Sequence, residues 1–516
     1  MSFGDIIKMN SFRLLIVTIL GVAFSQIIAM VQVYVANGQL SEQVKCLKAH
    51  GYMVIPNIHV LPYLERLSTA FFGGLFFTFT IGLGIVGITY FLSWFWISKS
   101  NKSKLVLLFI IAQWIVIIFQ ANLSGFSSFN CYLLILAPVI FILNCLLPIS
   151  SNKISRRSIL FWIIPILFVV LFISFTDKSI SFISIRDYLL LSNKIGNKIN
   201  SIYYKYTLYP SEIIKPYALK QQKTCYISLK NKTINNRSLE QKYKRIKRKC
   251  IEYDYLIVSN QDIADLVLSI ENDNILLKCK GRTVLKTNIS NFLKKAKSIF
   301  KQYSEQTDTN QLFRYCIFLS LIIGAPLIIY IIFMNLLFSS MQMIKIADIY
   351  KEFIILSIIC LGLFFLIIQI PSKIDSDIKL EEWQILFKKA SKNKDWKQGI
   401  ELLKSIKNFQ IEKNNQIVLD WLKQTQNYAL KYWLVRFFVK LPKNEVPKLF
   451  YDLLKVPQQV NVTCQLLYVM GKQKDRKVIP KIREVVNSTH SWYIQMYGYR
   501  SLKRLGWVNF PQSIEW

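Results

Sequence analysis

Histidine is nearly absent from this chain, and the short motifs of common enzyme active sites are absent altogether. The 516 residues contain three histidines, His50, His59 and His490. There is no GxSxG elbow, phosphate-binding lysine loop, HExxH pair or CxxC pair. Nucleophilic catalysis needs a base beside the nucleophile, and imidazole is the most common one. The sequence therefore favours a protein without a catalytic site or cofactor, and a membrane-embedded enzyme is the third of three hypotheses.

Acidic residues are also scarce. The chain has 30 Asp+Glu against 65 Lys+Arg, a net charge of +35. Such an excess attracts anionic lipid headgroups or acidic partners. It is equally typical of a chain rich in Lys, Ile and Asn, in which the charge is background. No nucleic-acid-binding motif accompanies it, so we expect no nucleic-acid partner.

Charged residues are missing from the centres of seven apolar runs. Each run is close to the ~20 residues that cross a hydrocarbon core of ~30 Å. Hydrophobic residues make up 53% of the chain. We therefore predict a multi-pass α-helical membrane protein with about seven spans, the first of them a retained anchor. The predicted spans are 12–35, 69–96, 105–122, 131–148, 159–176, 313–338 and 352–371.

The short loops between these runs predict an orientation. The loops after the second and fourth runs each carry three basic residues, within 99–104 and 153–157, whereas loop 123–130 has no charge. Basic loops stay in the cytoplasm. We expect a cytoplasmic N-terminus and an extracytoplasmic 177–311 segment. With seven spans the C-terminal segment lies on that same side, and with one span fewer it lies in the cytoplasm. A bacterial inner membrane is the expected location.

Small residues in the second run predict close helix packing. Gly74, Thr78 and Gly82 are spaced by four and share one helix face. The stretch from Gly82 through Gly84 to Gly87 also matches the GxGxxG dinucleotide-binding pattern. That pattern needs a preceding strand and a solvent-facing helix start, which an apolar run does not supply, so we favour packing.

Two further groups of residues are candidate sites. Cys46, His50 and His59 lie in the loop between the first two runs, but a metal site needs about four ligands, so an ordered interfacial loop is the favoured interpretation. A basic cluster in the 177–311 segment could touch anionic surfaces, although a solvated helix face is favoured. It consists of Lys242, Lys244, Arg245, Lys247, Arg248 and Lys249.

Residues 177–311 have the pattern of a small α+β domain. Alternating β-prone stretches and amphipathic stretches follow one another. Cys225, Cys250 and Cys279 all fall here, and the sequence leaves open whether two of them form a disulfide. The predicted strands are 224–229, 255–258, 264–271 and 274–280, and the predicted helices are 238–252 and 291–303.

Residues 372–516 are predicted to be helical throughout, with helices at 427–440 paired with 444–455, 458–470 paired with 477–487, and then 491–505. The stretch from Leu467 to Ile482, and the helix from Tyr499 to Gly506, resemble HEAT-like α-helical repeats. The resemblance covers about residues 427–506. It implies an all-α stack with an extended face for protein partners, and it implies no activity.

The predicted organisation is a membrane domain (1–176), an extracytoplasmic α+β domain (177–311), two further spans (312–371) and an α-helical domain (372–516). The leading hypothesis is a non-catalytic membrane scaffold or assembly protein that contacts lipids and binds protein partners through its soluble domains. The alternative is a transporter or lipid-handling protein. A cavity lined by Gln113, Gln120, Asn144 or Asn335 would favour that alternative.

Overall fold

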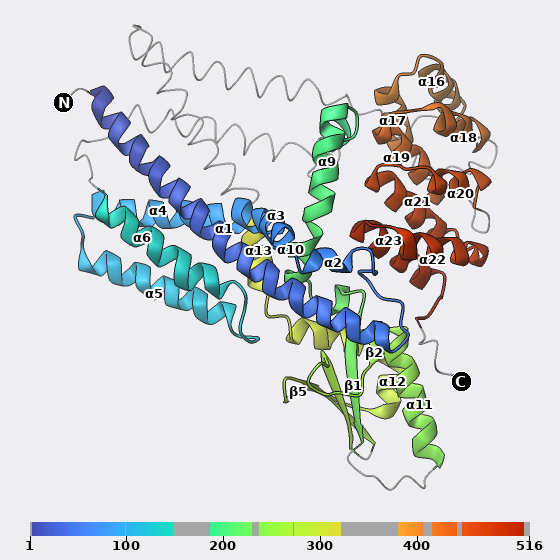
Figure 1. Cartoon of the computed structure of the whole chain (residues 1–516), viewed down its shortest axis with the longest axis horizontal. Coiled ribbons are helices and arrows are strands. Elements are labelled where there is room, and N and C mark those ends of the chain that lie inside the picture. Colours follow the sequence, from blue (N-terminus) through green and yellow to red (C-terminus); the bar gives the residue numbers. More distant parts are fainter. Residues whose placement is uncertain are drawn as a thin grey trace.

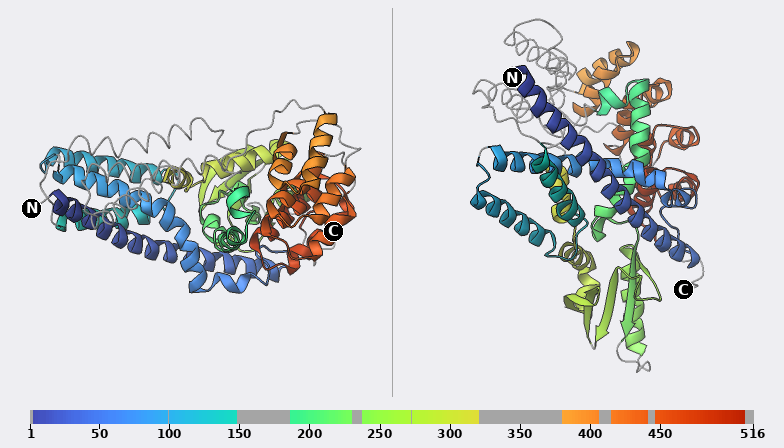
Figure 2. Two further views of the ribbon diagram at one scale, coloured as in Figure 1. Left: turned by 90° about the horizontal axis from the view of Figure 1, so that it is seen from above. Right: turned by 60° about the vertical axis from the view of Figure 1, so that its left-hand side comes forward.

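The computed structural model describes residues 3–98, 100–147, 186–229, 237–271, 273–320, 380–405, 415–440 and 446–509. They are mostly helical and include one small mixed sheet (Figure 1). Apolar helices lie at one end of the molecule. The sheet and a second group of helices lie at the other end (Figure 2).

Helix α1 (Phe3–Ala49) joins the two ends of the molecule. Its 47 residues span ~70 Å, about twice the thickness of a bilayer core. The helix therefore extends beyond the predicted span 12–35 at both ends. The helix continues because Val44 and Leu47 are buried against Leu256 and Val258 of the sheet domain, which stabilises helix where sequence indicated a loop.

Three helical stretches are long and apolar enough to cross a membrane. They are Leu15–Ala49, Leu67–Ile97 and Lys104–Ala121. The fourth predicted span corresponds to a shorter apolar helix, Tyr132–Leu146. Predicted spans 159–176 and 352–371, and most of 313–338, lie outside the described residues. Of the first four predicted spans, three are thus candidate spans within the described residues, and the fourth is a shorter helix. The elements are α3 (Leu67–Phe77), η1 (Thr78–Gly82), α4 (Leu83–Ser98), α5 (Lys104–Ala121), η2 (Tyr132–Leu136), α6 (Ala137–Leu146) and α13 (Gln311–Leu319).

The three small residues predicted to pack all face α1. A Cβ atom at Gly74 would lie 3.0 Å from the backbone nitrogen of Met30, and one at Gly82 would overlap the Ser25 side chain. Between them, the Thr78 hydroxyl donates a hydrogen bond of 2.7 Å to Gln26. Side-chain volume would separate the two helices here.

The sheet domain contains five strands in the order β2-β1-β3-β4-β5. Strand β1 pairs parallel with β2 and β3, and the remaining pairs are antiparallel. The buried side chains of α11 and α12 share one core with the strands. The sequence missed β5, because Arg282 and Lys286 leave its exposed edge without an apolar pattern. The elements are β1 (Lys223–Leu229), α11 (Arg237–Glu252), β2 (Tyr255–Ile257), β3 (Leu266–Glu271), β4 (Asn274–Cys279), β5 (Arg282–Asn288) and α12 (Ile289–Gln306).

The C-terminal helical domain has two rows of helices. Each of α17, α19, α21 and α23 packs against the next, and α16, α18, α20 and α22 pair with them from outside. The predicted pairings of 427–440 with 444–455 and of 458–470 with 477–487 are corrected, because α20 packs on α21 and α22 packs on α23. The HEAT-like resemblance stays a prediction, since paired helices are common to many all-α domains. The elements are α16 (Leu380–Lys392), α17 (Trp396–Ser405), α18 (Asn415–Gln424), α19 (Tyr428–Phe437), η7 (Phe438–Lys440), α20 (Lys448–Lys455), α21 (Val460–Lys472), η8 (Arg476–Val478), α22 (Ile479–Ser488) and α23 (Trp492–Arg504).

A connecting segment lies between the apolar helices and the helical domain. It comprises η3 (Arg186–Leu190), α9 (Lys194–Tyr206), α10 (Leu208–Ile214) and η4 (Tyr217–Leu219). Helix α9 stands crosswise to α4, α5 and α6 and runs alongside the inner row of the helical domain (Figure 1). At its end, Tyr206 stacks on Phe72 of α3 with 4.6 Å between ring centroids.

We predict that Gly82→Ala destabilises the protein by about 1–3 kcal/mol, the usual cost of overpacking a well-packed contact. The matched control is Gly38→Ala on α1, where an added Cβ would meet nothing within 4 Å. Removing a helix glycine there should stabilise by about 0.5–1 kcal/mol. Denaturant unfolding of the full chain in one detergent measures both. Equal effects of the two substitutions would show that the contact between α1 and η1 is loose.

Candidate functional site

The loop after α1 is buried between the sheet domain and the helical domain, and Asn57 is its centre. The Asn57 side-chain nitrogen donates to the carbonyl oxygens of Val486, Asn487 and Thr489 at 3.0, 2.9 and 3.0 Å. Its backbone N–H donates to Gln495 at 3.0 Å. Helix α22 ends at this point, where its last carbonyls have no partner within the helix. Asn57 therefore attaches the loop to the helical domain by satisfying them.

The backbone of Met53, on the same loop, forms hydrogen bonds both to the end of the helical domain and to the sheet domain. Its N–H donates to Asn509 at 3.0 Å, and its carbonyl accepts from the Asn509 side chain at 2.8 Å. The same carbonyl accepts from Gln222, next to strand β1, at 2.6 Å. Gln222 in turn accepts from Ile55 N–H at 3.2 Å. These bonds join the helical domain to the sheet domain through the loop.

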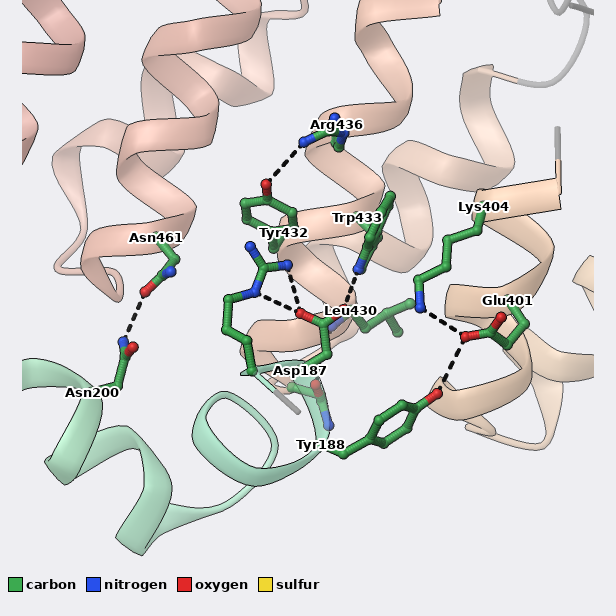
Figure 3. A network of polar contacts seen from close by, with 12 residues as sticks. Asp187, Tyr188, Asn200, Glu401, Lys404, Leu430, Tyr432, Trp433, Arg436 and Asn461 are labelled. Atoms are coloured by element: carbon green, nitrogen blue, oxygen red, sulfur yellow. Dashed lines mark hydrogen bonds and ion pairs between the residues drawn. The ribbon is translucent and has the colours of Figure 1, made fainter. Parts of the chain in front are cut away.

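A polar network joins the connecting segment to the inner row of the helical domain (Figure 3). The Asp187 carboxylate is fully buried and accepts from Arg186 at 2.6 Å and from the Trp433 indole at 2.7 Å. The Arg186 guanidinium lies over the Tyr432 ring, 4.1 Å from its centroid. A buried carboxylate is stable only with such partners. Asp187 therefore anchors η3 on helix α19.

Further contacts continue this network along the inner row. The Tyr188 hydroxyl donates to Glu401 of α17 at 3.4 Å, and Lys404 pairs with the same carboxylate at 2.8 Å. Burial, and then the charge of Glu401, raise the pKa of Tyr188. On α9, Asn200 donates to Asn461 of α21 at 2.8 Å. The connecting segment thus covers part of the face of the helical domain that was predicted to bind a partner protein.

A cluster of charges forms a second contact between the sheet domain and the helical domain. Asp254 accepts from the Tyr499 hydroxyl at 3.0 Å and pairs with Lys503 at 3.1 Å. The Lys223 ammonium lies nearby, 4.8 Å from the centroid of the Tyr255 ring. Burial lowers the pKa of Lys223 to about 8, and the carboxylates of Asp254 and Asp265 only partly oppose that shift.

A cavity of about 940 Å³ opens where α1, α10, the α5–α6 loop and the sheet domain meet. We name it the junction cavity. Val31 and Val35 of α1 and Phe126 line its end nearest the apolar helices. Farther along α1, it is lined by Glu42 together with Asp262 and Lys280 from the sheet domain. Its wall therefore changes from apolar to charged over a few turns of one helix.

Two polar side chains of α1 also line the cavity, Gln32 between the two valines and Asn37 after them. Asn37 is 1% exposed, and its side-chain nitrogen has no hydrogen-bond partner within the described part of the chain. Gln32 donates to the Ser128 carbonyl at 2.6 Å, but its own side-chain oxygen has no partner among the same residues. A buried donor without a partner is costly. Both residues line the junction cavity, where a ligand could complete them.

The candidate metal ligands do not come together. Cys46 lies on the last turn of α1, and His50 directly follows the helix and contacts the Cys46 carbonyl at 2.8 Å. His59 instead lies beside His490, with 4.8 Å between the ring centroids. Within the described ranges, no group of three or more potential ligands is found.

The other candidates were the basic cluster and the three cysteines, all of which lie in the sheet domain. In the basic cluster of α11, Lys242 pairs with Asp273, Lys244 with Glu240 and Lys249 with Glu252, so its charge is partly offset within the sheet domain. Cys225 and Cys250 are buried in the core of that domain as free thiols, and Cys279 is also free.

Of the side chains expected to line a transport cavity, the three that the structure describes do not line the junction cavity. Gln113 and Gln120 are exposed on α5. Asn144 is buried and donates to Ser93. Asn335 lies outside the described residues. Sequence analysis instead missed Asn37, because it falls in what was expected to be a loop.

Comparison with protein-family models, curated proteins and solved structures finds no match to this chain.

We predict that the free energy of unfolding rises with pH between about 8 and 10 through Lys223. In that window the lysine is neutral when folded but still charged when unfolded, so raising the pH favours the folded state. The comparison is Lys223→Met, which cannot titrate. The stability of this variant minus that of the wild type should decrease as pH rises from 7 to 9.5, measured by denaturant unfolding in detergent. A difference independent of pH would show that Lys223 titrates normally.

Proposed function

We propose that the chain is an integral membrane protein that binds an amphipathic membrane lipid in the junction cavity, without a catalytic step. The junction cavity carries this proposal. Its apolar end borders side chains that face outward from the apolar helices. Its other end is lined by charged groups and by polar groups that lack a hydrogen-bond partner among the described residues. A cavity of about 940 Å³ is also of the size that binds small ligands.

The exposed surface of the apolar helices supports a membrane location. On α5, Leu105, Ile115 and Phe119 are all exposed, and Leu123 follows them. So long a stretch of exposed apolar side chains favours a lipid environment over water. The distribution of basic loops then supports the proposed orientation, with the junction cavity on the extracytoplasmic side of a bacterial inner membrane.

The order of groups along α1 matches the order of groups in a lipid. Val31 and Val35 suit an acyl chain, and the side-chain N–H groups of Asn37 suit the ester or phosphate oxygens that follow it. Glu42, Asp262 and Lys280 carry both signs of charge, as a zwitterionic headgroup does. A lipid could enter sideways, with its tail remaining in the bilayer.

We predict that Val35→Trp lowers the amount of phospholipid that copurifies with the protein, because an indole would fill the apolar end of the junction cavity. Val35 lines the cavity and is 53% exposed, so the larger side chain fits without disturbing the core. The neighbouring control is Tyr34→Trp, since Tyr34 is 43% exposed but does not line the cavity. Native mass spectrometry in detergent counts the bound lipids. Unchanged lipid on Val35→Trp would contradict the proposal.

A second candidate function is the membrane scaffold. It is supported by Ile385 of α16 and Val456 after α20, two exposed apolar side chains on the helical domain. A photo-crosslinking amino acid at Ile385 should then capture one partner protein in cells. The matched control is Gln261, an exposed polar residue of the sheet domain. The same yield at both positions, or uncrosslinked monomer alone, would count against a docking surface at Ile385.

A further inference from the structure

Helix α9 has three distinct faces. One face packs against the helical domain. There Asn200 donates a hydrogen bond to Asn461, and the Tyr204 hydroxyl accepts one from Asn461 at 2.7 Å. A second face carries Ile195, Ile199 and Ile202, whose spacing places them in one stripe, and all three are exposed. The third face carries the exposed side chains of Lys194, Lys198 and Lys205 along one edge of that stripe.

The position of α9 relates it to the apolar helices. It lies crosswise to α5 in Figure 1, and Figure 2 shows the same arrangement from above. Its last residue stacks on Phe72, in the second turn of α3, where the candidate span 67–97 begins. If α5 and α3–α4 cross a bilayer, α9 therefore lies along the surface at one end of the spans.

We infer that α9 is an interfacial helix that inserts its isoleucine stripe into the outer leaflet and holds anionic headgroups with its row of lysines. The inference rests on the membrane location proposed above, and it is independent of the junction cavity. Amphipathic helices with lysine at the polar edge bind in this way. The exposed Leu67, Phe71 and Phe72 of α3 continue the apolar surface of the stripe. The opposite face is occupied by the helical domain, so this contact would rest the helical domain on the membrane.

The test places a diazirine amino acid at one position of the full chain in nanodiscs of phosphatidylethanolamine and phosphatidylglycerol. Ile199 (54% exposed) is the test position, and Ile115 on α5 (61% exposed) is the reference for the bilayer. Ile385 on α16, which is 69% exposed, is the control away from the membrane. After irradiation, mass spectrometry identifies adducts. We expect lipid adducts at Ile199 and Ile115 and none at Ile385.

Each other outcome is informative. Lipid at Ile115 but not at Ile199 would overturn the interfacial helix and leave the membrane location intact. No lipid at either position would overturn the membrane location itself. An adduct from Ile199 to a second copy of the chain would identify the stripe as a dimer contact instead.

A second measurement tests the lysines. Replacing Lys194, Lys198 and Lys205 together with glutamine should reduce the ratio of phosphatidylglycerol to phosphatidylethanolamine adducts at Ile199 by about threefold or more, since each lysine near the surface attracts anionic lipid. The control replaces Lys388, Lys389 and Lys392 of α16, which carries the same charge change. An equal ratio in both variants would show that the lysines do not select headgroups.

Discussion

The burial of the loop after α1 is the constraint on which the rest of the arrangement depends. A loop inside a protein carries backbone groups that need partners. Here the partners come from two different parts of the chain, Gln222 before the first strand and Asn509 after the last helix. Asn57 completes the end of α22 as well. The loop can therefore be buried only when both soluble domains are in place, which couples their positions to the helix that precedes it.

The helical domain packs against other parts of its own chain. Asp187 and Asn200 occupy its inner row, and Trp492 and Tyr499 of its last helix belong to a core shared with α1. A stack of helices was expected to offer an extended face to other proteins. Part of that face is instead covered by the chain's own connecting segment.

Segments whose structure follows from local pattern were predicted well. The apolar runs at 69–96 and 105–122, and the strand and helix at 224–229 and 238–252, agree with the structure to within two residues. The length of α1 was not predictable, because Val44 and Leu47 are stabilised by a sheet more than 200 residues away.

The sites were harder to predict from the sequence than the helices and strands. Asn57 and Asp187 look like ordinary loop residues, and their partners in the helical domain lie 246 or more residues later in the chain. Asn37 gave no signal, because a single asparagine in a polar stretch does not reveal that it will be buried. By contrast, Gly74 and Gly82 could be selected beforehand, since small residues at a spacing of four are visible without knowing the partner helix.

The continuity of α1 has a mechanical consequence. A helix of ~70 Å that tilts by about 5° moves its far end by ~6 Å, and helices tilt when bilayer thickness changes. The outer part of α1 is bound to the sheet domain and, through its loop, to the helical domain. If α1 crosses a bilayer as proposed, a change in bilayer thickness must therefore carry the sheet domain and the helical domain along with α1, or separate them from it at the wall of the junction cavity.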